Sequence, residues 1–75
     1  MNLNEVKLNT NSIVVAVNIG DEKTKFRLME LGLVNGVQVK VIKKSALKKT
    51  LLIVFNSTCF TLKDNLAREI EVKYA

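Results

Sequence analysis

Two glycines four residues apart, Gly32 and Gly36, constrain the fold of this 75-residue chain more than any other feature. Gly32 directly follows a segment rich in apolar residues, where a helix can end in the left-handed conformation that glycine adopts at least cost. In such a stop, Leu28 and Leu33 are the side chains that touch. Asn35 and Gly36 form a dipeptide typical of turns, and valines then alternate with polar residues, as in a half-buried strand. The sequence therefore predicts a helix, a glycine stop, a turn and a strand in direct succession.

The predicted helix spans residues 22–31. Asp21 is its expected N-cap, and Glu22 lies in the first turn, where a negative charge interacts favourably with the helix dipole. The apolar residues of the helix form two pairs with i, i+3 spacing, which we expect to face the core. These pairs are Phe26 with Met29, and Leu28 with Leu31.

The remaining pattern predicts five short strands. They cover residues 12–19, 37–44, 51–55, 58–62 and 67–74, with a hairpin tip at 45–50 and a helical turn at 63–66. The first strand is expected to carry apolar residues on both faces, Ile13, Val15, Val17 and Ile19 on one and Val14 and Ala16 on the other. Residues 1–11 are predicted to be a docked segment without regular structure, held by Leu3, Val6 and Leu8.

These elements predict a mainly β, small α+β fold in which about five strands close into a barrel, with one short helix after the first strand. Closure is expected because it removes exposed sheet edges. A chain of this length forms one domain, residues 1–75. No apolar run approaches the roughly 18 residues of a membrane helix, and no signal peptide is evident, so we expect a cytoplasmic chain without direct membrane insertion.

The positive charge is concentrated in one segment. Between residues 40 and 49 the chain has five lysines and no acidic residue, while its other seven basic residues are balanced by seven acidic ones. The segment has two interpretations: a solvated sheet edge protected by lysines, or a contact surface for an acidic partner. Leu47 favours the second, because it lies at the expected hairpin tip where no core explains it. The candidate partner-binding residues here are Lys43, Lys44, Leu47, Lys48 and Lys49.

No set of residues indicates catalysis, a metal site or a cofactor. The chain has no histidine, and its serines have no candidate base nearby in the sequence. Cys59 is the single cysteine, expected to be half-buried as a small hydrophobic residue, whereas a structural zinc site needs about four ligands. We therefore predict a non-enzymatic protein with no metal ligands and no cofactor. On the helix, packing does not require Arg27 and Glu30, which are further candidates for a partner contact.

The central segment resembles the ferrous iron transport protein A family, the FeoA-like domains. The matching residues are Arg27, Leu28, Glu30, Leu31, Gly32, Leu33, Gly36, Val39 and Val41, and a closing pattern follows at Phe60, Thr61, Leu62, Ala67, Ile70 and Val72. Asn35 stands where the family usually has proline before the turn glycine. The resemblance covers residues 3–72 and implies an SH3-like barrel. It further implies a small cytoplasmic accessory or regulatory protein that contacts the membrane ferrous iron transporter with its GTPase domain.

Two other interpretations stay open. Residues 36–42 also resemble the glycine-containing strand of KOW-type barrels, in which the lysine segment would bind RNA phosphates. Nucleic acid is the less favoured partner, because three of the four aromatic residues are predicted to face the core and few remain to stack on bases. The chain also resembles a stand-alone version of the C-terminal SH3-like domain of iron-dependent repressors.

Overall fold

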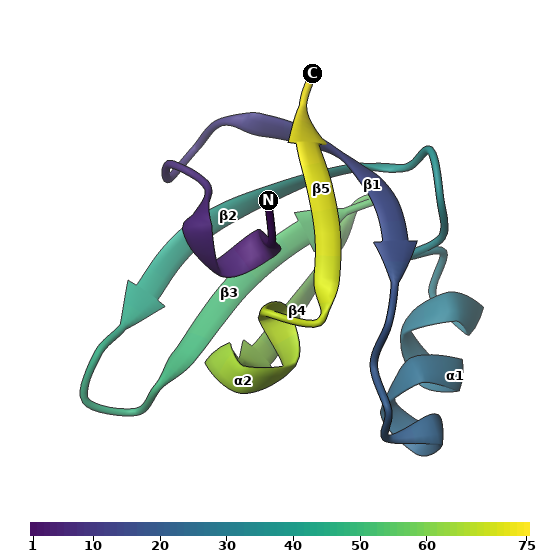
Figure 1. Cartoon of the computed structure of the whole chain (residues 1–75). Helices are drawn as coiled ribbons and strands as arrows, with labels where there is room; N and C mark the ends of the chain where they lie inside the picture. Colours follow the sequence, from purple (N-terminus) through teal and green to yellow (C-terminus); the bar gives the residue numbers. More distant parts are fainter.

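Five antiparallel strands form one strongly curved sheet in the computed structural model, which describes residues 1–75 (Figure 1). The elements in chain order are η1 (Leu3–Glu5), β1 (Asn11–Val17), α1 (Glu22–Glu30), β2 (Gln38–Ser45), β3 (Thr50–Phe55), β4 (Thr58–Lys63), α2 (Asp64–Ala67) and β5 (Ile70–Tyr74). The order across the sheet is β4-β3-β2-β1-β5. The predicted β-barrel, with one short helix after its first strand, is confirmed.

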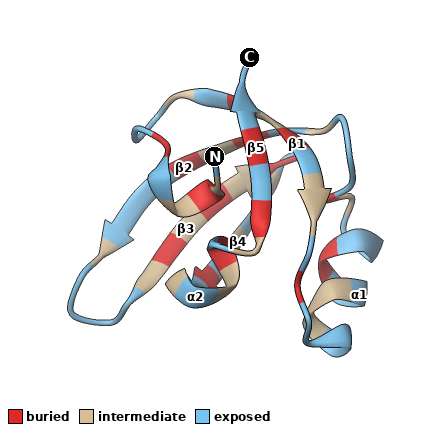
Figure 2. Ribbon diagram, in the orientation of Figure 1, coloured by how far each residue is buried: buried red, intermediate tan, exposed pale blue.

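The core lies inside the curve of the sheet. Fifteen buried hydrophobic residues form one cluster, and Figure 2 shows buried positions alternating with exposed ones along the strands. The N-terminal segment closes part of the barrel, since Val72 in β5 donates its N–H to the carbonyl oxygen of Met1 at 2.8 Å. Ser12 is the one buried polar residue, and its hydroxyl has no hydrogen-bond partner.

The glycine stop of α1 has the predicted geometry. Gly32 has a φ of +109°, and its N–H donates to the carbonyl of Met29 at 3.0 Å. Leu33 donates to the carbonyl of Leu28 at 2.9 Å, which completes a Schellman motif. A second constraint was not visible in the sequence: the Asn56 side chain donates to the Gly32 carbonyl at 3.2 Å and occupies the space that a Cβ would need.

The turn after the stop joins α1 to the sheet. Val37 donates to the carbonyl of Val34 at 3.1 Å, and Gly36, the third residue of this turn, has a φ of +90°. That combination defines a type II turn. Gly36 also donates to the carbonyl of Val14 in β1 at 2.8 Å, so the turn hydrogen-bonds directly to the neighbouring strand. The turn predicted at Asn35 and Gly36 is confirmed.

The prediction that two apolar pairs of the helix face the core is wrong. Only Leu28 is buried in α1, whereas Phe26 is 58% exposed, Met29 is 41% exposed and Leu31 is also exposed. Successive helical residues are about 100° apart, so Phe26 points almost directly away from Leu28. Leu28 is thus the one residue of α1 that is buried in the core, and the other apolar residues of the helix are partly exposed to solvent.

The predicted faces of the first strand are partly wrong for a different reason. Residues Ser12 and Val14 face the core, and Val15 is exposed. The register with β5 shifts between Val14 and Ala16, so Val15 is an extra, bulged residue. A bulge exchanges the inward and outward faces beyond it, which explains why Ile19 is buried although it has the same parity as the exposed Val15.

Three smaller predictions also need correction. The N-terminal segment does contain a regular element, η1, whose N-cap Asn2 forms a capping box with Glu5. Leu8 is exposed and does not anchor this segment. Cys59 is exposed and not half-buried. Asp21 is the N-cap of α1 as predicted, but its carboxylate accepts from the Thr24 hydroxyl and not from a backbone N–H.

Candidate functional site

The seven residues predicted to contact a partner lie on two separate sides of the molecule. Arg27 and Glu30 are exposed on α1, while the hairpin formed by β2 and β3 extends from the opposite side of the barrel (Figure 1). The structure therefore divides the predicted site into two surfaces, and each has its own composition.

A bulge in β2 determines how the lysines of the hairpin are presented. The pairing with β3 shifts between Val41 and Lys43, so Ile42 is the extra residue. Beyond the bulge, Lys44 pairs with Leu51, whose side chain is buried. Cross-strand partners share a face, and Lys44 thus reaches the barrel end, where its Nζ donates to the carbonyl oxygen of Asn4 at 2.7 Å. Lys44 ties the hairpin to the N-terminal segment and is not a free cation.

The hairpin tip, residues 46–49, carries the most exposed large apolar side chain of the protein. Leu47 is 93% exposed. The tip is shaped locally: the backbone N–H of Lys48 donates to the Ser45 hydroxyl oxygen at 3.2 Å, and Lys49 has a φ of +54°. Leu47 therefore projects from an ordered turn and makes no contribution to the core.

Two basic residues that were not predicted from the sequence, Lys63 and Arg68, lie beside the hairpin tip. Lys63 at the end of β4 pairs with Thr50, and Asp64 donates its N–H to the carbonyl of Lys49 at 2.9 Å. A hollow between the tip and α2 is lined only by polar and charged residues, namely Lys48, Lys49, Lys63, Asp64, Asn65 and Arg68. We call Lys43, Leu47, Lys48, Lys49, Lys63 and Arg68 the basic end. Because only two residues separate the predicted strands 51–55 and 58–62, the sequence already implied a hairpin that returns Lys63 to the tip.

The second surface consists of exposed apolar residues on and after α1. Phe26 and Met29 are one helical turn apart, and Met29 shares a groove with Val34 in the turn that follows. The groove lies between α1 and the end of β1, with the side chains of Val17 and Lys25 also lining it. We call Phe26, Met29 and Val34 the helix surface. Glu30 lies one turn from Phe26, at the edge of the helix surface, and Arg27 lies beyond Glu30 on the same flank of the helix.

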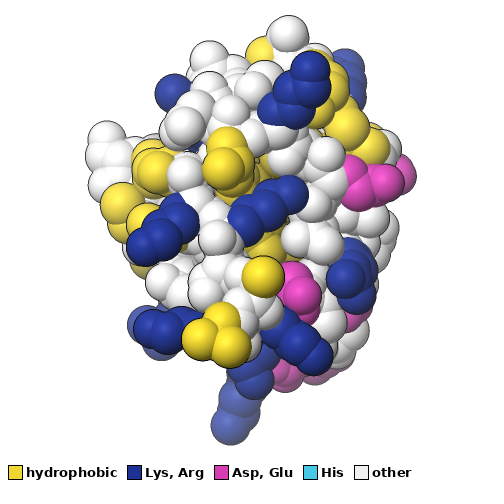
Figure 3. All heavy atoms as spheres, turned by 90° about the vertical axis from the view of Figure 1, so that its left-hand side faces the viewer, with side chains coloured by type: hydrophobic (Ala, Val, Ile, Leu, Met, Phe, Trp, Pro, Cys, Tyr) yellow, Lys and Arg dark blue, Asp and Glu magenta, His cyan; other side chains and the backbone are white.

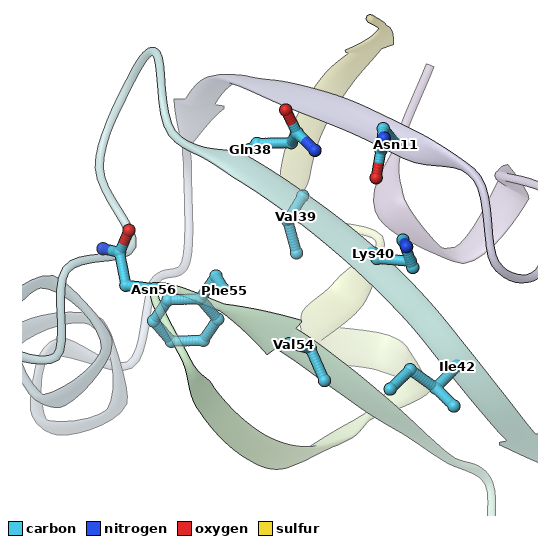
Figure 4. A pocket seen from close by; sticks show the side chains of 8 residues that line it. All are labelled: Asn11, Gln38, Val39, Lys40, Ile42, Val54, Phe55 and Asn56. Atoms are coloured by element: carbon cyan, nitrogen blue, oxygen red, sulfur yellow. The ribbon is translucent and has the colours of Figure 1, made fainter.

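A third hollow lies on the outer face of β2 and β3 (Figure 4). Figure 4 shows Ile42 and Val54 side by side on the two strands, with the amide side chains of Asn11 and Gln38 at the other end. Lys40 is its only charged residue. The hollow holds no pair of groups that could act as acid and base, and it adds no catalytic candidate.

The aromatic residues are distributed differently from the prediction. Phe55 alone is buried, Phe60 is partly buried, and Phe26 and Tyr74 are exposed, so the expectation that three of four face the core is wrong. A further hollow at the hairpin is lined by Lys43, Ser45, Lys48, Thr50, Leu52 and Thr61. Neither this hollow nor the one between the tip and α2 is lined by an aromatic side chain. The Tyr74 hydroxyl oxygen accepts from the backbone N–H of Lys7 at 3.2 Å, at the far end of β5. The exposed aromatics are therefore not at the basic end.

Two structural findings concern metals and membranes. No group of three or more His, Cys, Asp or Glu side chains is placed to hold a metal ion. Neither α1 nor any other helix is long and apolar enough to cross a membrane.

The fold and its open surfaces define a small antiparallel barrel of the SH3-like class. Comparison with known proteins gives the family: the FeoA domain model matches residues 1–74, and the chain belongs to this family. An Fe(2+) transport protein A of Campylobacter jejuni is 32% identical over 72 residues, which cover 96% of each chain. The family is associated with ferrous iron transport, so the resemblance inferred from the sequence is confirmed.

Solved structures agree with this assignment. The solution structure of FeoA from Chlorobium tepidum has a TM-score of 0.89 at 31% identity, covering 99% of this chain and 70% of that one. FeoA from Stenotrophomonas maltophilia, solved with zinc and described as a procaryotic SH3 domain protein, has a TM-score of 0.82 at 30% identity, covering 97% and 89%. A manganese-dependent transcriptional repressor has a TM-score of 0.86 at 13% identity, and the chain covers 41% of it. At that identity the likeness to the repressor concerns the fold alone.

Proposed function

We propose that this chain is a single-domain, non-enzymatic accessory protein of ferrous iron uptake. It acts in the cytoplasm by binding the membrane iron transporter that carries a GTPase domain. Membership of the FeoA family supports the role in iron transport, and the two exposed surfaces support a role in binding. The residues of this chain that contact the transporter are those of the helix surface, together with Arg27 and Glu30 beside it.

The observation that carries this proposal is the exposure of Phe26 and its neighbours. A 58% exposed phenylalanine next to an exposed methionine and an exposed valine is apolar area that the domain does not use for its own core. Exposed apolar patches rimmed by charged residues mark protein–protein contacts, and aromatic residues contribute most when they fill a partner's pocket. Since Leu28 is the only buried residue of α1, the exposed parts of Phe26 and Met29 are open to a partner.

The test is binding to the isolated GTPase domain of the transporter from the same organism. The full chain and a Phe26→Ser, Met29→Ser variant are compared by calorimetry. We expect the variant to lose at least tenfold in affinity, because removal of a buried interface anchor costs on the order of 2 kcal/mol or more. Glu30→Ala is expected to have a smaller effect, since charges at the rim of an interface contribute little to affinity.

Leu8→Ser is the matched control. Leu8 is exposed to a similar extent but lies in the loop between η1 and β1, away from α1. Its substitution is expected to leave the affinity unchanged. Undiminished binding by the Phe26→Ser, Met29→Ser variant would contradict the assignment of this surface, and absence of binding by the unmodified chain would contradict the proposed partner.

A further inference from the structure

The basic end combines more positive charge than its own fold requires. Five cations, Lys43, Lys48, Lys49, Lys63 and Arg68, come from the hairpin, the end of β4 and the residue after α2. Asp64 is the single acidic residue that lines the hollow between them. Lysines that only protect a sheet edge would not need Lys63 and Arg68 to converge on the same hollow from another part of the chain. The hollow instead presents a cation-lined, fully polar site to an anion.

Leu47 adds an apolar element directly beside this hollow. It is adjacent in sequence to Lys48, which lines the hollow, and with 93% of its surface exposed it is not covered by the lysines. Figure 3 looks onto this side of the molecule and shows dark-blue basic side chains distributed around small yellow apolar groups. The hairpin tip is a projection, and no aromatic side chain lines the two hollows beside it.

We propose that the basic end attaches the protein to an anionic phospholipid surface. Lipid phosphates bind among Lys48, Lys49, Lys63 and Arg68, and the Leu47 side chain enters the boundary between head groups and acyl chains. Basic residues around a protruding apolar side chain match both layers of such a surface, the charged one and the apolar one. This attachment is peripheral and needs no membrane-spanning segment.

Other occupants match the basic end less well. RNA would be held by phosphate contacts and by bases stacked on aromatic side chains, and the hollows here have no aromatic lining. An acidic protein surface would match the cations, but an isolated leucine on a projection needs a pocket in the partner, whereas lipid accepts it anywhere. The lipid surface is therefore the occupant that uses both features without further requirements.

The inference is independent of the transporter contact. The basic end and the helix surface lie on opposite sides of the barrel (Figure 1), so lipid attachment leaves Phe26 and its neighbours free. The experiment below contains no transporter. Absence of vesicle binding would therefore contradict the lipid proposal without contradicting the proposed contact with the transporter.

The first test is co-sedimentation of the full chain with vesicles of phosphatidylcholine, with and without phosphatidylglycerol. We expect binding only to the anionic vesicles, weakened by added salt as the charges are screened. Each basic residue near such a surface contributes about fivefold in affinity. The variant Lys48→Ala, Lys49→Ala, Lys63→Ala, Arg68→Ala should therefore bind roughly several-hundred-fold more weakly. The matched control Lys7→Ala, Lys23→Ala, Lys25→Ala, Lys73→Ala removes the same charge elsewhere and should keep most of the binding.

The second test uses the absence of tryptophan from the chain. Leu47→Trp places a single indole at the hairpin tip, and its emission should shift to the blue when anionic vesicles are added. Leu8→Trp, exposed in the loop before β1, should show no shift. Leu47→Ala should weaken vesicle binding by roughly tenfold, the value of one buried leucine side chain. Thermal unfolding of each variant establishes that it is folded before it is compared.

Three outcomes would overturn the proposal. The first is absence of binding to phosphatidylglycerol vesicles at about 0.1 M salt, where exposed charges still interact within a Debye length. The second is equal loss of binding in the two fourfold alanine variants, which would indicate a response to net charge alone. The third is vesicle binding without a Leu47→Trp shift, together with equally strong binding to single-stranded RNA, which would make the basic end a general polyanion site.

Discussion

The helix surface and the basic end both expose leucine-sized apolar side chains, but their surroundings differ. Phe26 lies one helical turn from Met29, and Met29 and Val34 line a partly apolar groove. Leu47 stands alone among cations beside a hollow with no apolar lining. Apolar contact acts only at short range and depends on a close fit of shapes. Electrostatic attraction acts over about 10 Å at moderate salt and does not need such a fit. The two surfaces therefore suit different partners, one with a fitted pocket and one with a diffuse negative charge.

The difference also has a structural origin. The helix surface exists because only one of the nine residues of α1, Leu28, is buried in the core. The basic end exists because the β2–β3 hairpin is longer than the core beneath it, so its last residues extend past the buried Leu51 and Leu62. Both surfaces are parts of the chain that the core does not use. Substitutions can test this division, and the largest expected effects come first.

Two leucines, one from each region, give the sharpest contrast. Leu28→Ala should lower the free energy of unfolding by about 2–5 kcal/mol, because the side chain is fully buried and leaves a cavity. Leu47→Ala should change it by less than about 0.5 kcal/mol, as is usual for exposed positions. Urea denaturation of both variants measures the difference. A destabilisation by Leu47→Ala of more than about 1 kcal/mol would show that the tip packs against something in solution.

Alanine substitutions at the two glycines that follow α1 distinguish the cost of backbone strain from the cost of side-chain crowding. Gly36→Ala should cost about 1–2 kcal/mol, since its φ is positive but the space for a Cβ is open. Gly32→Ala should cost more, about 2–4 kcal/mol, because the new Cβ meets the Asn56 side chain in addition to the same strain. Adding Asn56→Gly to Gly32→Ala should recover part of this loss. Equal costs at the two glycines, measured by thermal unfolding, would rule out the contribution of Asn56.

Much of the fold could be predicted because it depends on local rules. The stop at Gly32, the turn at Gly36 and the alternation in β2 are set by backbone conformation and by period-two burial, which the sequence displays directly. The bulges at Val15 and Ile42 could not be predicted. A bulge depends on the register with a neighbouring strand, and the alternation of the strand itself does not reveal where one extra residue lies.

The candidate site was predictable in part for the same reason. The lysines and Leu47 form one continuous segment, and their exposure follows from the hairpin tip. The arrival of Lys63 and Arg68 depends on strand order and was overlooked. The helix surface was misassigned because an apolar i, i+3 pair at Phe26 and Met29 looks the same in sequence whether it faces a core or a partner. Only the packing of α1 distinguishes the two cases.

Smaller changes in the free energy of unfolding are expected from substitutions in two turns, the turn between β3 and β4 and the hairpin tip. Ser57 and Lys49 both have positive φ values, 60° and 54°, in positions where glycine is favoured. Ser57→Gly and Lys49→Gly should each stabilise the fold by about 0.5–1 kcal/mol, as backbone strain is relieved and partly offset by the entropy of glycine. Only Lys49→Gly should also weaken binding to anionic vesicles, by about fivefold. If Ser57→Gly also weakened vesicle binding, the lipid-binding surface would extend beyond the residues of the basic end.

A small effect on stability is also expected for Phe26→Ser. Phenylalanine and serine have similar helix propensities, so the substitution reports mainly on the burial of the side chain. With 58% of the residue exposed, the free energy of unfolding should fall by less than about 1 kcal/mol, against about 3–5 kcal/mol for truncating a core phenylalanine. Phe55→Ala, at a buried position, provides that reference. If Phe26→Ser were as costly as Phe55→Ala in urea denaturation, α1 would pack with its aromatic face inward. The helix surface would then not exist, and the protein would have only its basic end to offer a partner.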